Sequence, residues 1–215
     1  MRIRLAGCLV LLATAPAWAG ASFDCNKAAT LVEKTVCADT NYLLAYRDGI
    51  LGRLYVDLKK MGGHDDVLAG QKAWLKLRDA CKADVNCLTQ TYDERIAALA
   101  EAGGDVEHVT GAYGYSNKEY ESSGELWLVR EVDGSLTGRI ETVTGPTAHI
   151  CDVELDQAQP HGKAWVWVDP DSDDEGKSCR VRLEGGARAF AVTSENCSIY
   201  CGVAGYFDDI YKRAQ

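Results

Sequence analysis

Apart from Cys8, the nine cysteines of this 215-residue chain leave eight that divide evenly between its two halves, and these eight constrain its fold more than any other feature. The first half carries Cys25, Cys37, Cys81 and Cys87, and the second half carries Cys151, Cys179, Cys197 and Cys201. An even number of cysteines in an exported chain predicts a disulfide framework. We therefore expect two sets of disulfides, each confined to one half of the chain.

The first 19 residues predict a secretory signal peptide. Two arginines precede a short apolar run, and a small-residue cleavage site ends at Ala19. We expect cleavage after about Ala19 and a periplasmic or secreted mature protein, with no integral membrane segment. The alternative is a lipid anchor on Cys8, because Leu5 to Cys8 matches a lipoprotein box. Its apolar run, however, follows the cysteine instead of preceding it.

The negative charge lies almost entirely in the second half. Residues 20–104 hold 12 acidic and 11 basic side chains, whereas residues 105–215 hold 20 acidic and 10 basic ones. The negative electrostatic field of this half argues against nucleic acid and anionic lipid as partners and favours a basic protein. The alternative is that the charge serves solubility alone.

Residues 20–102 predict a disulfide-stapled helical bundle. Thr30 and Glu33 have the spacing of a capping box, and leucines from Leu44 to Leu58 form one apolar stripe. A local bridge between Cys25 and Cys37 is feasible, because the segment before the cap is long enough to fold back.

The stretch from residue 71 to residue 96 predicts two helices folded back on each other. The first helix ends at Cys81, and Asp84 is a natural N-cap for the second. Cys81 and Cys87 lie at the edges of the turn, where their Cα atoms can come within the roughly 4.4–6.8 Å of a disulfide. We expect a helical hairpin stapled at its bend.

Several motifs in this half resemble one known family. The matching segments are FDCNKA (Phe23 to Ala28), VEKTVC (Val32 to Cys37), QKAWLKLRDAC (Gln71 to Cys81), CL (Cys87 and Leu88) and YDERI (Tyr92 to Ile96). Together they resemble the N-terminal domain of the LprI-like lysozyme inhibitors, over about residues 23–99. The resemblance implies an exported envelope protein and names lysozyme inhibition as its activity.

The family-motif side chains are Gln71, Trp74, Arg78, Tyr92 and Arg95. Arg78 and Arg95 lie on or beside apolar helical faces. We expect them to form structural ion pairs or to stack on Trp74; the alternative is a recognition surface.

Residues 103–108 predict a linker, and residues 109–215 predict an acidic β-domain. Beyond Val109 the apolar residues alternate with polar ones in about eight short segments, as in strands with one buried face. We expect an antiparallel meander closed as a small barrel. The segment CSIYCGVAGYFDDIY, from Cys197 to Tyr211, also resembles small periplasmic β-domains.

The meander places all four cysteines of the second half at one end of the barrel. Direct pairing of Cys151 with Cys179 would cross an intervening strand, about 9.5 Å away by strand spacing. We favour a pairing of each with Cys197 or Cys201.

An acidic run lies between two predicted strands and is either a solvated turn or a contact surface for a basic partner. Its members are Asp169, Asp171, Asp173, Asp174 and Glu175. The run fails the calcium-loop pattern, which needs a glycine at position six and a glutamate at position twelve. Cysteine spacing does not match a zinc site. We expect no metal and no cofactor.

These patterns predict an α+β protein in two domains that acts by binding, not as an enzyme. The leading hypothesis is a periplasmic lysozyme inhibitor, with a basic protein such as a lysozyme as partner. The alternative is a non-inhibitory accessory or structural module of the cell envelope. The sequence leaves open the type of lysozyme, the partner of the β-domain and the oligomeric state.

Overall fold

The computed structural model describes residues 20–171 and 177–214. The predicted signal peptide, with Cys8 and the Ala19 cleavage site, lies outside the described residues. Within the described ranges, no helix is both long enough and apolar enough to cross a membrane.

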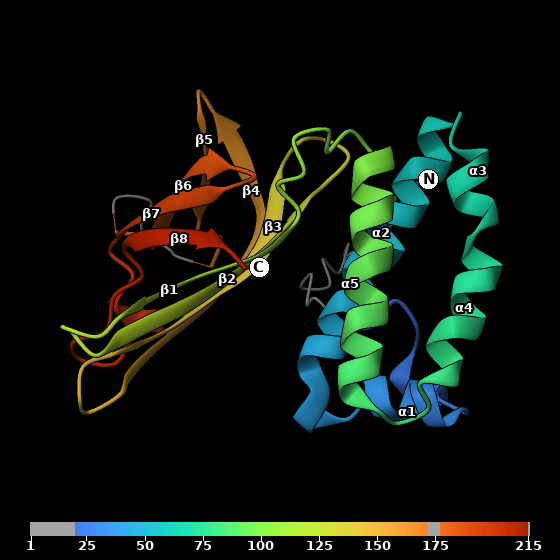
Figure 1. Cartoon of the computed structure of the whole chain (residues 1–215), viewed down its shortest axis with the longest axis horizontal. Coiled ribbons are helices and arrows are strands. Elements are labelled where there is room, and N and C mark those ends of the chain that lie inside the picture. The colour runs from blue at the N-terminus through green and yellow to red at the C-terminus, as the bar shows by residue number, and fades with distance from the viewer. Residues whose placement is uncertain (1–19, 172–176, 215) are drawn as a thin grey trace, which may run out of the picture.

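The N-terminal half is helical, as predicted (Figure 1). Its elements are the short 3-10 turns η1 (Cys25–Lys27) and η2 (Asp39–Asn41) and the helices α1 (Leu31–Val36), α2 (Tyr42–Met61), α3 (Asp65–Ala69), α4 (Gln71–Ala80) and α5 (Val85–Ala102). The capping box that opens α1 is confirmed: Thr30 Oγ1 accepts from the Glu33 amide, and the Glu33 carboxylate accepts from the Thr30 amide. These bonds satisfy amides that the first helical turn leaves without a partner.

The helical core forms where α2 packs against α5. Leu44, Leu51, Leu54 and Leu58 of α2 are all buried, as the apolar stripe predicts. Two disulfides brace this part. Cys25–Cys37 ties η1 to the end of α1, and Cys81–Cys87 closes the bend between α4 and α5.

The C-terminal half is a closed antiparallel barrel of eight strands in meander order, and this prediction is confirmed. The strands are β1 (Gly111–Asn117), β2 (Ser122–Arg130), β3 (Leu136–Thr144), β4 (His149–His161), β5 (Ala164–Val168), β6 (Arg180–Gly186), β7 (Ala189–Glu195) and β8 (Asp209–Arg213). Alternate side chains face the interior and form a second core. Pairing of β1 with β8 closes the barrel.

The barrel contains two disulfides, Cys151–Cys201 and Cys179–Cys197. Both attach the connection between β7 and β8 to a strand or a strand end elsewhere in the barrel. Disulfide bonding in both halves of the chain is thus present, as predicted.

Strand β4 contains a bulge, and its last residues, beyond that bulge, pair with β5 instead of β3. Leu136 of β3 faces Ala158, whereas Gly138 faces Leu155, so β4 carries an extra residue between these pairs. Gln157 at the bulge has a positive φ of 53°. After the bulge β4 continues to His161 and pairs with β5. The strand is therefore longer than the sequence pattern suggests, because a bulge interrupts the alternation of side chains.

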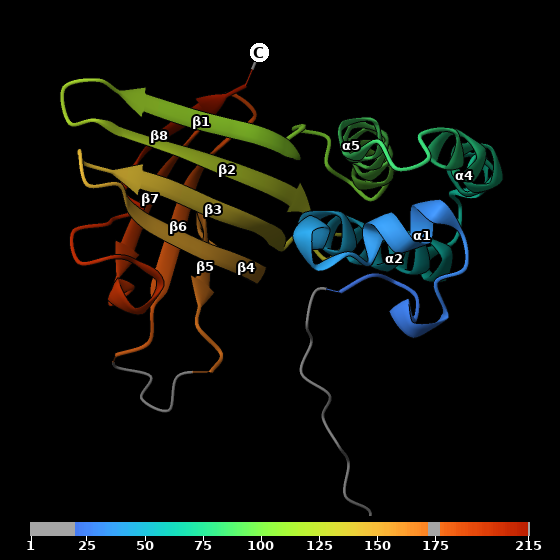
Figure 2. The same ribbon diagram turned by 90° about the horizontal axis from the view of Figure 1, so that it is seen from below.

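The helices α2 and α5 lie beside the ends of β2 and β3 (Figure 2). Val129 of β2 is fully buried in the helical core. The predicted linker is short and anchored: the buried carboxylate of Asp105 accepts hydrogen bonds from the amides of Val109 and Thr110 at 2.9 and 2.8 Å. The two halves therefore share a packed boundary.

Candidate functional site

The family-motif residues meet between α4 and α5. The Trp74 ring packs edge-on against Tyr92, with ring centroids 5.4 Å apart. The indole Nε1 donates to the carbonyl of Thr91 at 3.0 Å. Asp84 caps α5 by accepting from the Cys87 amide at 3.1 Å, so the capping residue and the disulfide fix the bend together.

Tyr92 connects the hairpin to a buried carboxylate on α2. Its hydroxyl donates to Asp48 Oδ2 at 2.7 Å. Asp48 is only 3% exposed, and its Oδ1 accepts from the amide and hydroxyl of Ser22. Burial, followed by the Asp48 carboxylate, raises the pKa of Tyr92 above its ordinary value, so the phenol remains a proton donor. Three donors thus satisfy a carboxylate that burial would otherwise make costly.

Both arginines of the hairpin have structural partners, as the packing interpretation expects. The Arg78 guanidinium lies 5.6 Å from the centre of the Trp74 ring and pairs with Asp79 at 2.8 Å. Arg95 donates to Gln71 Oε1 at 3.0 Å and to the carbonyl of Val67 at 2.8 Å. These contacts account for all five family-motif side chains as parts of the helical packing.

A groove of about 700 Å³ runs between α2, α4 and the segment that precedes η1. Its wall is closely fitted, because a Cβ at Gly52 would lie 2.6 Å from the Ser22 Cβ. Of the carboxylates lining it, Asp48 is fully hydrogen-bonded and Asp57 pairs with Lys60 at 2.8 Å. Both of these carboxylates are therefore engaged by neighbouring side chains.

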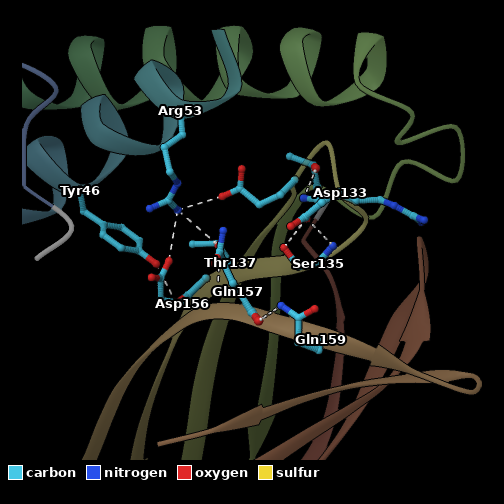
Figure 3. Close-up of polar contacts among 12 residues, drawn as sticks. Tyr46, Arg53, Asp133, Ser135, Thr137, Asp156, Gln157 and Gln159 are labelled. Carbon is cyan, nitrogen blue, oxygen red and sulfur yellow. Dashed lines mark hydrogen bonds and ion pairs between the residues drawn. The ribbon is translucent and has the colours of Figure 1, made fainter. Parts of the chain in front are cut away.

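A second polar cluster joins the helices to the barrel, and Arg53 of α2 is its centre (Figure 3). Its guanidinium pairs with Glu131 at 2.9 Å and with Asp156 at 3.3 Å. Glu131 is 5% exposed, and burial raises the pKa of its carboxyl. Thr137 Oγ1 lies 3.4 Å from the same nitrogen of Arg53 and accepts from the amide of Gln157 at 3.2 Å. The bulge in β4 therefore places Asp156 where α2 can reach it.

Tyr46 and Arg47 of α2 make further contacts with strands β2 and β3 at this boundary. The hydroxyl of Tyr46 donates to the carbonyl of Gly138 at 2.9 Å. A Cβ at Gly138 would lie 2.1 Å from the Trp127 carbonyl oxygen, so only glycine fits there. The Arg47 guanidinium lies 4.8 Å from the centre of the Trp127 ring and also pairs with Asp93 at 2.7 Å.

The prediction that Asp169 belongs to an exposed acidic contact surface is wrong. Asp169 is buried, and its carboxylate accepts from Tyr200 Oη at 3.0 Å and from the Asp171 amide at 2.9 Å. It therefore closes a turn instead of facing a partner, because its oxygens satisfy nearby donors. Asp171 is exposed. Asp173, Asp174 and Glu175 lie outside the described residues, so their role stays a prediction.

Sequence reasoning missed Asp48, Arg53 and Glu131. Asp48 had a signal, because it falls on the apolar stripe of α2 between Leu44 and Leu51. A charged residue on a buried helical face implies a partner. Arg53 and Glu131 are 78 positions apart and had no local signal.

The chain is similar to the lipoprotein LprI of Mycobacterium bovis and of two strains of Mycobacterium tuberculosis. Each is 36% identical over 87 residues, which are 39% of this chain and 43% of the relative. The chain thus spans less than half the length of these curated relatives. No protein-family model and no solved structure matches the chain.

Proposed function

We propose that this is an exported protein that inhibits a lysozyme by binding it. The similarity to lipoprotein LprI supports this function, because the motifs of the helical half resemble the LprI-like lysozyme inhibitors. In this proposal the leader is removed after about Ala19. Residues 20–102 then form a scaffold domain, residues 103–108 a linker and residues 109–215 the acidic binding domain.

The charge of the barrel supports a basic partner. Residues 105–215 carry 20 acidic and 10 basic side chains, and the helical half is nearly neutral. Animal-type lysozymes are basic, so opposite charges accelerate their encounter with the barrel, and salt weakens this effect. The carboxylates of a lysozyme cleft would gain nothing from further negative charge, so the attraction acts on the basic rim of that cleft.

One observation favours a second function, a non-inhibitory accessory or structural module of the envelope. The family-motif side chains Gln71, Trp74, Arg78, Tyr92 and Arg95 are all engaged in packing between the helices. Their presence in a chain is therefore explained by stability alone. Neither function requires catalysis, so we propose a binding protein and not an enzyme.

The deciding experiment mixes the purified mature protein with lysozymes of the c, g and i types. Binding and lysis of cell walls are measured at low and at high salt. We expect inhibition of at least one type, with slower association at high salt. Absence of both binding and inhibition for all three types would reject the inhibitor and favour the structural module. N-terminal sequencing of the exported protein checks the cleavage site.

A further inference from the structure

The connection between β7 and β8 exposes apolar side chains at the tip of the barrel. We name residues 197–206 the braced loop. Ile199 is 74% exposed, Val203 is fully exposed and Tyr206 is also exposed. Ile150, at the start of the neighbouring strand β4, is exposed as well. Single exposed apolar residues need no explanation, but several on one loop indicate a contact surface.

Two disulfides and several hydrogen bonds hold this loop in place. Cys197 is bonded to Cys179 and Cys201 to Cys151, so the loop is attached to the barrel at two points. The amide of Gly202 donates to the carbonyl of Ile150 at 2.9 Å. A loop held in this way loses little conformational entropy when it binds, which favours affinity.

Side chains add two further attachments. Thr142 Oγ1 donates to the carbonyl of Tyr206 at 2.8 Å. Tyr200 Oη donates to the buried carboxylate of Asp169 at 3.0 Å. Burial, followed by the Asp169 carboxylate, raises the pKa of the Tyr200 hydroxyl to about 12. Asp169 thus supports the loop from the next connection along the barrel end.

The braced loop lies at the end of the barrel away from the helices (Figures 1 and 2). In an antiparallel meander the β1–β2, β3–β4, β5–β6 and β7–β8 connections share one end, and the β2–β3 turn lies at the other. The helices pack beside that second turn through Glu131 and Arg53. A partner can therefore approach the loop without contact with the helical part.

Acidic side chains flank the loop along the chain, and the exposed Arg180 of β6 lies opposite Glu195 in the strand register. Between Arg188 and Lys212 the sequence contains no lysine or arginine, whereas Glu195, Asp208 and Asp209 are acidic. Glu195 and Asp208 are exposed. Apolar anchors inside a charged rim are the usual arrangement of a protein-binding surface, in which the rim steers the partner and the anchors hold it.

We propose that the braced loop is the contact surface for the basic partner and that Ile199 and Val203 are its apolar anchors. The partner would present an apolar recess within a positively charged surface. This inference rests on the proposed function and assigns its binding residues. It places binding on the barrel tip, and not on the helical half from which the family resemblance comes.

The test replaces each anchor by glutamate, as Ile199→Glu and Val203→Glu. The matched control for Val203→Glu is Val106→Glu, which makes the same substitution at an exposed valine in the segment between the helices and the barrel. Dissociation constants are measured against the c-, g- and i-type lysozymes. Thiol counts and urea unfolding confirm that each variant keeps its disulfides and its fold.

We expect each anchor variant to bind at least about tenfold more weakly, since a charge cannot enter an apolar recess without loss of hydration. We expect Val106→Glu to bind at least as tightly as the wild type. Added negative charge favours a basic partner, so charge alone predicts tighter binding for all three variants. Weaker binding by an anchor variant would therefore result from the loss of its apolar side chain, and not from the added charge.

Two results would overturn the inference, and they are distinguishable. If the wild type binds a lysozyme and the anchor variants match Val106→Glu, the inhibitor stands and the braced loop is not its contact surface. If the wild type binds none of the three lysozymes, the proposed function and the inference fall together.

Discussion

The helical part and the barrel each contain two disulfides, but the bridges of the barrel enclose longer stretches of chain. In the helical part the bonded cysteines are 12 and 6 positions apart. In the barrel they are 50 and 18 positions apart. The first pair secures local turns that capping residues already favour. In the barrel, Cys151–Cys201 attaches the braced loop to β4, and Cys179–Cys197 joins it to the start of the neighbouring strand β6.

The two parts also differ in how they use their conspicuous side chains. The tryptophan, tyrosine and arginines of the hairpin contact one another and a buried carboxylate. The barrel instead leaves Ile199 and Val203 exposed on a braced loop within an acidic half of the chain. The helical part thus keeps its conspicuous side chains for packing, whereas the barrel leaves its own open to solvent.

Removal of disulfides gives the largest expected difference between the parts. We expect Cys151→Ser with Cys201→Ser to lower the free energy of unfolding by roughly 4 kcal/mol, and Cys81→Ser with Cys87→Ser by roughly 2 kcal/mol, because longer loops gain more entropy when opened. Urea unfolding of both double variants measures the two losses in the free energy of unfolding. Equal losses would show that the bridges of the two parts are energetically equivalent.

Tyr92→Phe probes the interior of the helical part. It removes a donor from the buried Asp48 carboxylate, which the phenol contacts at 2.7 Å. We expect a loss of about 2 kcal/mol in the free energy of unfolding, as for hydrogen bonds to charged groups. Unchanged lysozyme binding in the same variant would agree with a scaffold role for the hairpin; loss of binding with little loss of stability would contradict it.

Tyr46→Phe probes the boundary between the two parts. Its hydroxyl donates to a neutral carbonyl, that of Gly138. We expect a loss of about 1 kcal/mol, smaller than that of Tyr92→Phe because the acceptor is uncharged. The same urea titration measures both variants. A loss larger than that of Tyr92→Phe would mean that the boundary, and not the helical core, limits stability.

Glu131→Gln gives the smallest expected effect, on the pH dependence of stability. Burial raises the folded pKa of Glu131 above its ordinary 4.5, so this carboxyl favours the folded state most below pH 4.5. That contribution is lost as the pH rises through the folded pKa. As the pH rises above about 4.5, the wild type should therefore lose stability relative to Glu131→Gln. Parallel pH profiles of the two proteins would refute this role for Glu131.

Features that depend on neighbouring residues could be predicted from the sequence. The capping box of Thr30 and Glu33, the N-cap Asp84 and the bend at Cys81 follow from spacing within one or two helical turns. The alternation of apolar residues likewise predicted the strands and their inward faces, because side chains on a strand point to opposite sides in turn. The closed barrel followed from the number and order of these strands.

Contacts between distant segments could not be predicted in this way, because they depend on how the chain packs in three dimensions. The pairing of Arg53 with Glu131, the bulge that positions Asp156 and the burial of Asp169 each depend on segments that register and packing bring together. The same holds for the apolar side chains of the braced loop. Their exposure depends on how the loop is positioned at the end of the closed barrel. A local sequence pattern does not distinguish an apolar side chain on the surface from one in the core.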